Sequence, residues 1–118
     1  MSDEAAEKHY DKLKIEMTNQ KHYQNSDLSL SQLAEIMEIH PNYLSQIINE
    51  KEGKSFYEFI NSYRVNEFKR LVSLPDKQAF TLLALAYDCG FSSKSSFNRH
   101  FKSATGLTPS EYKKSLSS

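Results

Sequence analysis

The sequence predicts an all-α protein in which one two-helix unit occurs twice. Matching residues recur in the two halves of the 118-residue chain: Leu44 and Phe97, like Gly53 and Gly106, are 53 positions apart. No strand-like alternation of any length is present, and three glycines and three prolines are few for an all-β protein. We therefore expect about seven helices, arranged as two helix-turn-helix subdomains joined by a long linker helix.

A first helix is expected over residues 4–22, where Tyr10, Leu13 and Met17 fall at spacings of three and four and form one narrow apolar stripe. The stripe is too short for the sustained heptads of a coiled coil, so we expect this helix to pack on the first unit. A polar break follows it. The chain is thus divided into an N-terminal helix or connector (1–26), a first subdomain with the linker helix (27–74) and a second subdomain (75–118).

The first unit begins at a capping box with Ser29 at the N-cap position. Pro41 suits the first position of the next helix, because the N–H that proline lacks has no partner there, and that helix stops before Gly53. A further capping box at Ser55 opens a long helix whose wide apolar surface suggests burial between two neighbours. This long helix is the expected linker.

The second unit repeats this design. A short helix over 81–88 is followed by a tight turn at Gly90, and Ser92 or Ser93 caps the next helix. A capping box at Thr108, with proline at the first helical position, precedes a last short helix.

The charge of the chain is zero overall but unevenly distributed. Residues 1–50 contain four Lys/Arg and nine Asp/Glu, whereas residues 51–118 contain eleven Lys/Arg and six Asp/Glu. Attraction to phosphate acts within about 8–10 Å, so the local sign matters more than the sum. The second half therefore favours nucleic-acid binding, and the first half counts against strong non-specific binding.

A specific string lies in the second unit: GFSSKSSFNRHFK over 90–102, followed by TGLTP over 105–109. These residues resemble the AraC-type family of bacterial transcription regulators, whose DNA-binding module has two helix-turn-helix units joined by a long helix. The first unit matches as well, and the resemblance covers roughly residues 28–114. The first unit departs from the family at its turn and next cap, where Glu38 and His40 stand in place of the usual glycine and serine.

A recognition helix must show polar side chains to base edges while its other face packs into the domain. In the second unit Phe97 and Phe101 face inward, and we expect DNA contacts from Ser93, Lys94, Ser95, Asn98, Arg99 and Lys102. Arginine pairs with guanine and asparagine with adenine, each for about 1–3 kcal/mol of discrimination. In the first unit Leu44 and Ile48 face inward, and we expect base contacts without added charge from Asn42, Ser45, Gln46 and Asn49. The alternative is that these side chains form solvated faces, with Arg99 in packing or an internal ion pair.

The resemblance implies sequence-specific binding of double-stranded DNA by two recognition helices in adjacent major grooves. The chain would be the cytoplasmic output domain of a bacterial transcription regulator, an activator, with RNA polymerase and a sensor domain of the parent chain as further partners. The alternative function is a helical protein-interaction module without DNA binding, which the zero net charge and the acidic first half favour.

Other classes of function find no support in the sequence. It contains no glycine-rich phosphate loop, no paired-carboxylate pocket and no nucleophile with an evident base, so we expect no enzyme. We also expect no cofactor, no metal site and no small-molecule ligand in this fragment. The single cysteine, Cys89, excludes an internal disulfide, and the acidic N-terminus does not resemble a signal peptide.

Overall fold

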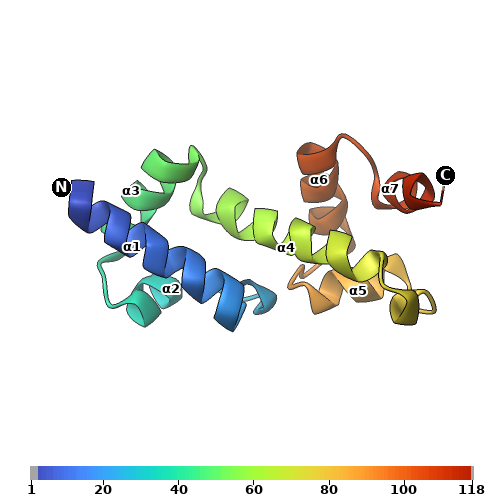
Figure 1. The fold of residues 1–118 in the computed structure, drawn as a ribbon, viewed down its shortest axis with the longest axis horizontal. Helices are drawn as coiled ribbons and strands as arrows, with labels where there is room; N and C mark the ends of the chain where they lie inside the picture. The colour runs from blue at the N-terminus through green and yellow to red at the C-terminus, as the bar shows by residue number, and fades with distance from the viewer. Residues whose placement is uncertain (1–2, 118) are drawn as a thin grey trace. The chain divides into compact units, whose positions relative to one another are not determined.

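The computed structural model describes residues 3–117, and within them all regular structure is helical, which confirms the all-α prediction (Figure 1). Two compact units are present, one up to Ile60 and the other from Asn61. The boundary lies inside the long helix α4 (Phe56–Val72), which is the expected linker helix. None of the described helices is long and apolar enough to cross a membrane.

The first helix, α1 (Asp3–Ile15), continues into a π-helical turn, η1 (Glu16–Gln20). Lys21 then adopts a left-handed conformation, with φ of 50°, and the chain enters a short 3-10 helix, η2 (His22–Gln24). The helical segment therefore ends at Gln20, and the stretch expected as a plain polar break contains a helical turn with a buried tyrosine, Tyr23.

The first helix-turn-helix pair consists of α2 (Leu30–Met37) and α3 (Pro41–Glu52). The predicted capping box at Ser29 is present. Glu38 adopts the left-handed conformation usual for glycine, with φ of 59°. His40 acts as the N-cap of α3, because its Nδ1 accepts a hydrogen bond from the Asn42 amide at 3.1 Å. The turn therefore keeps a left-handed residue without glycine, and α3 keeps a side-chain N-cap without serine.

The expected packing of α1 on the first unit is confirmed. Leu13 and Met17 of the apolar stripe are fully buried, and Tyr10 donates a hydrogen bond to Glu52 at the end of α3. At the other end of α3, the ring of Tyr43 meets His9 edge-on, with 5.2 Å between centroids. These contacts fix α3 against α1 at both of its ends.

The second unit contains the remainder of α4, a 3-10 turn η3 (Pro75–Lys77), α5 (Leu82–Asp88), α6 (Lys94–Thr105) and α7 (Pro109–Leu116). Gly90 makes the turn between α5 and α6 with φ of 108°. The core of this unit is made of buried residues from α4, α5, α6 and the segment before α6, and these are Val65, Phe68, Leu71, Val72, Leu85, Ala86, Cys89, Phe91, Phe97 and Phe101. Cys89 is a fully buried free thiol.

Candidate nucleic-acid interface

Helix α6 is anchored to the second unit by one apolar side. Phe97 and Phe101 are buried, and their ring centroids lie 4.8 and 5.2 Å from that of Phe68 on α4. The Phe101 ring also meets Tyr112 of α7 at 5.4 Å. At the start of the helix, the Ser93 hydroxyl accepts the Ser96 amide at 3.1 Å, so Ser93 and not Ser92 is the cap. These contacts determine which side of α6 faces solvent.

Of the predicted DNA-contacting residues of α6, Ser95, Arg99 and Lys102 lie on the side away from the two phenylalanines. Asn98 lies on the flank, and Lys94, in the first turn, lies nearer the side of Phe101. Each helical residue advances by about 100°, which places Arg99 on the side opposite the two phenylalanines. The exposed members of the set are Lys94, Ser95, Asn98, Arg99 and Lys102, while the cap Ser93 is half-buried. The side chains are therefore available to a ligand, although their contact with DNA stays a prediction.

A hollow of about 400 Å³ adjoins this face. Lys94, Asn98 and Lys102 line one side of it, and Thr108 and Ser110 at the start of α7 line another. Close by, the Thr108 backbone N–H donates a hydrogen bond to the Glu111 carboxylate, and this contact is the main reason why the pKa of Glu111 is held below its usual value. The Thr108 side chain, Lys102 and Lys114 add to the effect. Lys94 and Lys102 therefore line a hollow beside the carboxylate that caps α7.

Helix α3 offers a different surface. Asn42, Gln46 and Asn49 are exposed and Ser45 is half-buried, on the side of α3 away from buried Leu44 and Ile48. One of these side chains already has a partner on the same helix, since the Gln46 amide donates a hydrogen bond of 3.1 Å to the Glu50 carboxylate. The first recognition helix can therefore form hydrogen bonds but carries a carboxylate, and no cation, on this side.

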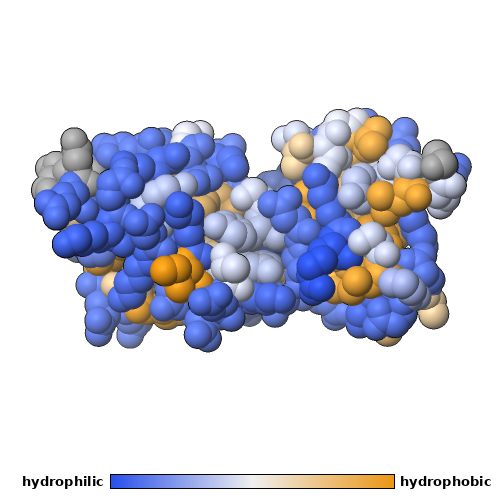
Figure 2. Space-filling model, in the orientation of Figure 1, coloured by the Kyte–Doolittle hydropathy of each residue, from blue (hydrophilic) through white to orange (hydrophobic). Residues whose placement is uncertain are grey.

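The basic residue of α3, Lys51, faces the first helix instead. Its ammonium group forms an ion pair with Glu7 of α1. The surface over α1 is largely hydrophilic (Figure 2), and residues 1–50 carry an excess of Asp/Glu. The excess of basic residues therefore lies outside residues 1–50.

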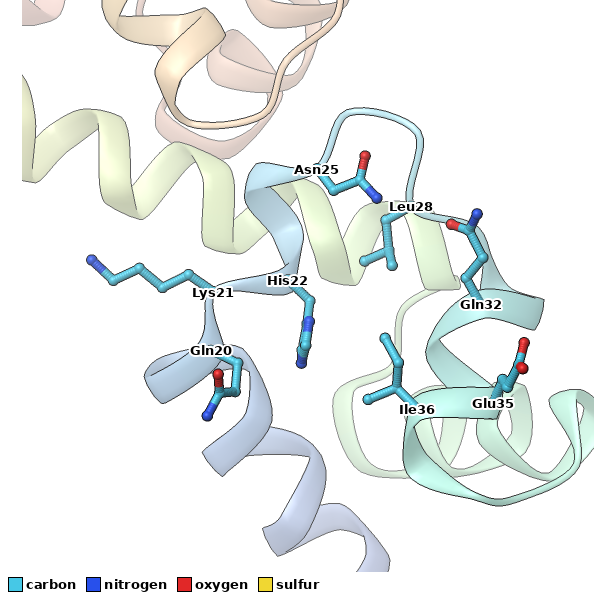
Figure 3. Close-up of a pocket in the computed structure, with 8 residues that line it drawn as sticks. All are labelled: Gln20, Lys21, His22, Asn25, Leu28, Gln32, Glu35 and Ile36. Carbon is cyan, nitrogen blue, oxygen red and sulfur yellow. The ribbon is translucent and has the colours of Figure 1, made fainter.

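A second hollow, of about 580 Å³, lies in the first unit between α2 and the segment that follows α1 (Figure 3). Ile36 and Glu35 project toward it from α2, and Leu28 and His22 from the preceding segment. None of the predicted site residues lines this hollow. Among residues 3–117, no group of three or more His, Cys, Asp or Glu is arranged to hold a metal ion.

The sequence interpretation missed a polar connection behind α6. Asn61 and Arg64 of α4 are 6% and 7% exposed, and Asn61 contacts His100 of α6. Burial lowers the pKa of Arg64 from its usual value. One feature of the sequence could have indicated this connection: two polar residues three positions apart lie inside a helix with a wide apolar surface. The apolar periodicity of the helix by itself assigns no role to either residue.

The geometry of two capped helices, each following a short helix and a tight turn, defines a helix-turn-helix protein. The sequence pattern of the family described as helix-turn-helix domain matches residues 33–115. The chain belongs to this family, in its AraC-type form, and the family is one of DNA-binding transcription-regulator domains and not of enzymes.

Similar proteins include regulators and a solved regulator domain. The chain is 36% identical over 89 residues to an uncharacterised helix-turn-helix-type transcriptional regulator of Staphylococcus aureus strain COL, and 35% identical over 89 residues to the uncharacterised regulator YobQ of Bacillus subtilis. Each match covers 75% of this chain, but 12% and 36% of those regulators. The C-terminal domain of AraT, a response regulator from Geobacillus stearothermophilus, has a TM-score of 0.67 at 26% identity, covering 93% of this chain and 84% of that one.

Proposed function

We propose that this chain binds double-stranded DNA sequence-specifically, as the output domain of a bacterial transcription regulator in the cytoplasm. The observation that carries the proposal is the exposed face of α6, where Arg99 lies opposite the buried pair Phe97 and Phe101. An exposed arginine on a capped and packed helix suits bidentate pairing with the two major-groove acceptors of guanine.

The phosphate contacts in this proposal come from Lys94 and Lys102. Both are exposed and line the hollow beside α6, so a DNA backbone can approach them while Arg99 reaches a base edge. Contacts of this kind fix register on the duplex, whereas the base contacts supply sequence discrimination. Asn98, on the flank of the helix, is the second candidate for a base contact, with adenine as its partner.

The first unit contributes base contacts through Asn42, Ser45, Gln46 and Asn49. We propose that α3 and α6 enter successive major grooves of one duplex, which are about 34 Å apart along the DNA axis. Because the α3 face adds no positive charge, this unit contributes to specificity more than to overall attraction.

The full-length protein is proposed to contain a sensor domain outside this chain and to activate transcription through RNA polymerase. The support for a further domain is that the chain spans 12% and 36% of the length of the two regulators it matches. Within this chain we propose no cofactor, no small-molecule ligand and no enzymatic reaction.

The test is selection of binding sites from a random duplex library, followed by affinity measurements on the selected and a scrambled sequence. Arg99→Ala should weaken binding to the selected duplex by about 1–3 kcal/mol and leave the scrambled duplex nearly unaffected. Equal losses on both duplexes would show that Arg99 contacts phosphate only. Recovery of no preferred sequence would reject sequence-specific binding.

The second candidate function is a protein-interaction module, which the acidic first half and the ion-paired Lys51 favour. The two functions differ in their response to salt. A DNA-binding module should be retained on random duplex at low salt and elute as salt is raised. A chain that flows through such a column at low salt would favour the interaction module.

A further inference from the structure

A polar connection inside the second unit links the long helix α4 to the recognition helix α6. The Arg64 guanidinium donates a 2.9 Å hydrogen bond to Oδ1 of Asn61, and Nδ2 of Asn61 lies 3.1 Å from Nε2 of His100. Asn61 and Arg64 are buried and His100 is half-buried. Among the described residues, no buried side-chain nitrogen or oxygen lacks a hydrogen-bond partner. A buried polar connection of this kind is specific in geometry, because each of its groups needs its partner.

The chemistry of the three side chains fixes the protonation of His100. A guanidinium group can only donate hydrogen bonds, so it must face the oxygen of the Asn61 amide, and the NH₂ group of Asn61 therefore faces His100. That NH₂ group also only donates, so Nε2 of His100 must accept. The imidazole in this arrangement is neutral and carries its proton on Nδ1.

The position of His100 allows its contacts to influence the direction of the neighbouring Arg99 side chain. Phe97 and Phe101 lie in one stripe along α6 and hold the helix against Phe68 of α4. His100 lies about 100° around the helix from Arg99, on the side of α6 that meets α4. Its ring stacks against that of Phe91, with 6.5 Å between the ring centroids. A contact on this flank opposes rotation of α6 about its own axis.

We propose that Asn61 is a positioning residue for DNA recognition, which acts through His100 to fix the rotation of α6 and hence the direction of Arg99. The inference rests on the proposed function. A side-chain tip that lies about 6 Å from the helix axis is displaced by about 1 Å when the helix rotates by 10°. Displacements of that size exceed the tolerance of a productive binding geometry, about 0.5 Å, so they reduce base discrimination while leaving phosphate attraction nearly intact.

The connection depends on the protonation state of His100. Adding a proton at Nε2 sets an N–H against the NH₂ group of Asn61, and the hydrogen bond is lost. The charged groups near His100 include Arg64 beyond Asn61 on α4 and Arg99 beside it on α6, and Phe91 contributes an uncharged ring. Further along α4, Glu67 is engaged with Arg70 at 2.6 Å. Base discrimination should therefore fall as the solution becomes acidic.

The first experiment needs neither a variant nor DNA. Nitrogen-15 NMR of the imidazole in the whole chain at pH 8 reports which ring nitrogen carries the proton. The arrangement requires the Nδ1–H form of His100. Finding the proton on Nε2 would overturn the inference and leave the proposed function untouched.

The second experiment compares affinity for the selected and the scrambled duplex at pH 8 and at pH 5.5. We define the discrimination ratio as the affinity for the selected duplex divided by that for the scrambled duplex. For the unaltered chain this ratio should fall about 5-fold on acidification, which corresponds to the loss of one neutral hydrogen bond. His100→Ala should lower the ratio about 5-fold already at pH 8 and abolish the further fall. His22→Ala alters a histidine of the first unit and serves as the control. This variant should still show the fall of the ratio on acidification.

Asn61→Asp separates positioning from a merely structural role. Its carboxylate still accepts from Arg64 but can pair with His100 only when Nε2 carries a proton, so the ratio should no longer fall at pH 5.5. A ratio that falls as in the unaltered chain would contradict the inference, as would equal losses on both duplexes in His100→Ala. Absence of binding to any duplex would reject the proposed function, whereas the NMR result would still decide the His100–Asn61 arrangement.

Discussion

Replacing Lys94 and Lys102 by glutamine should change the salt dependence of DNA binding. The two residues are eight positions apart on α6, which corresponds to about 12 Å along the helix axis. This separation exceeds the Debye length of about 8–10 Å at ordinary ionic strength. We therefore expect each lysine to neutralise a separate phosphate and the two effects to add.

The size of the effect follows from counterion release. Each neutralised phosphate contributes about 0.9 to the slope of log affinity against log salt concentration. Removing one lysine should thus flatten the slope by about 0.9, and removing both by about 1.8. Between 50 and 200 mM salt, each single variant should lose about 3.5-fold less affinity than the unaltered chain.

The assay is fluorescence anisotropy on a labelled duplex at four or five salt concentrations. Lys12→Gln is the matched control, because Lys12 is an exposed lysine of α1 and lies outside both polar faces. Its slope should equal that of the unaltered chain. Unchanged slopes in Lys94→Gln and Lys102→Gln would refute the assignment of these lysines to phosphate contacts, and a double variant no flatter than either single one would show that they share one phosphate.

Three further substitutions, one of them with a control variant, test the local structure. Glu38→Gly should raise the free energy of unfolding by about 0.5–1 kcal/mol, because glycine adopts the φ of 59° at this turn without steric cost; a lower denaturation midpoint would contradict this. Phe101→Ala should lower it by about 3–5 kcal/mol, measured by urea denaturation, since the ring is fully buried; a loss under 1 kcal/mol would show that the core differs. Ser93→Ala should lower the free energy of unfolding by about 1 kcal/mol through loss of the α6 cap. The control Ser95→Ala, at an exposed position, should lower it by less than about 0.5 kcal/mol. Equal thermal midpoints in these two variants would exclude a stabilising cap at Ser93.

Features determined by neighbouring residues were predictable from the sequence. The capping boxes at Ser29, Ser55 and Thr108 are present, because each depends on two side chains three residues apart. The inward orientation of Phe97 and Phe101 was also correct, since helical periodicity alone determines it. The exposed sides of the two recognition helices follow from the same periodicity.

Features that depend on tertiary contacts were not predictable in this way. The π-helical turn before Lys21 ends at a non-glycine residue in a left-handed conformation, and no local signal marks it. The cap of α3 is His40, a residue type outside the usual N-cap set. The burial of Asn61 requires knowing that α6 packs beside it, because an asparagine in a helix is ordinarily solvated.

The most direct measurement for the central claim is an amide NMR titration of the chain with its selected duplex. The claim is that the polar sides of α3 and α6 form the DNA-binding surface. It predicts chemical-shift changes concentrated in residues 42–49 and 93–102 that saturate together at one duplex per chain. Saturable binding whose shift changes fall in α1 and leave both of these segments unaffected would contradict it.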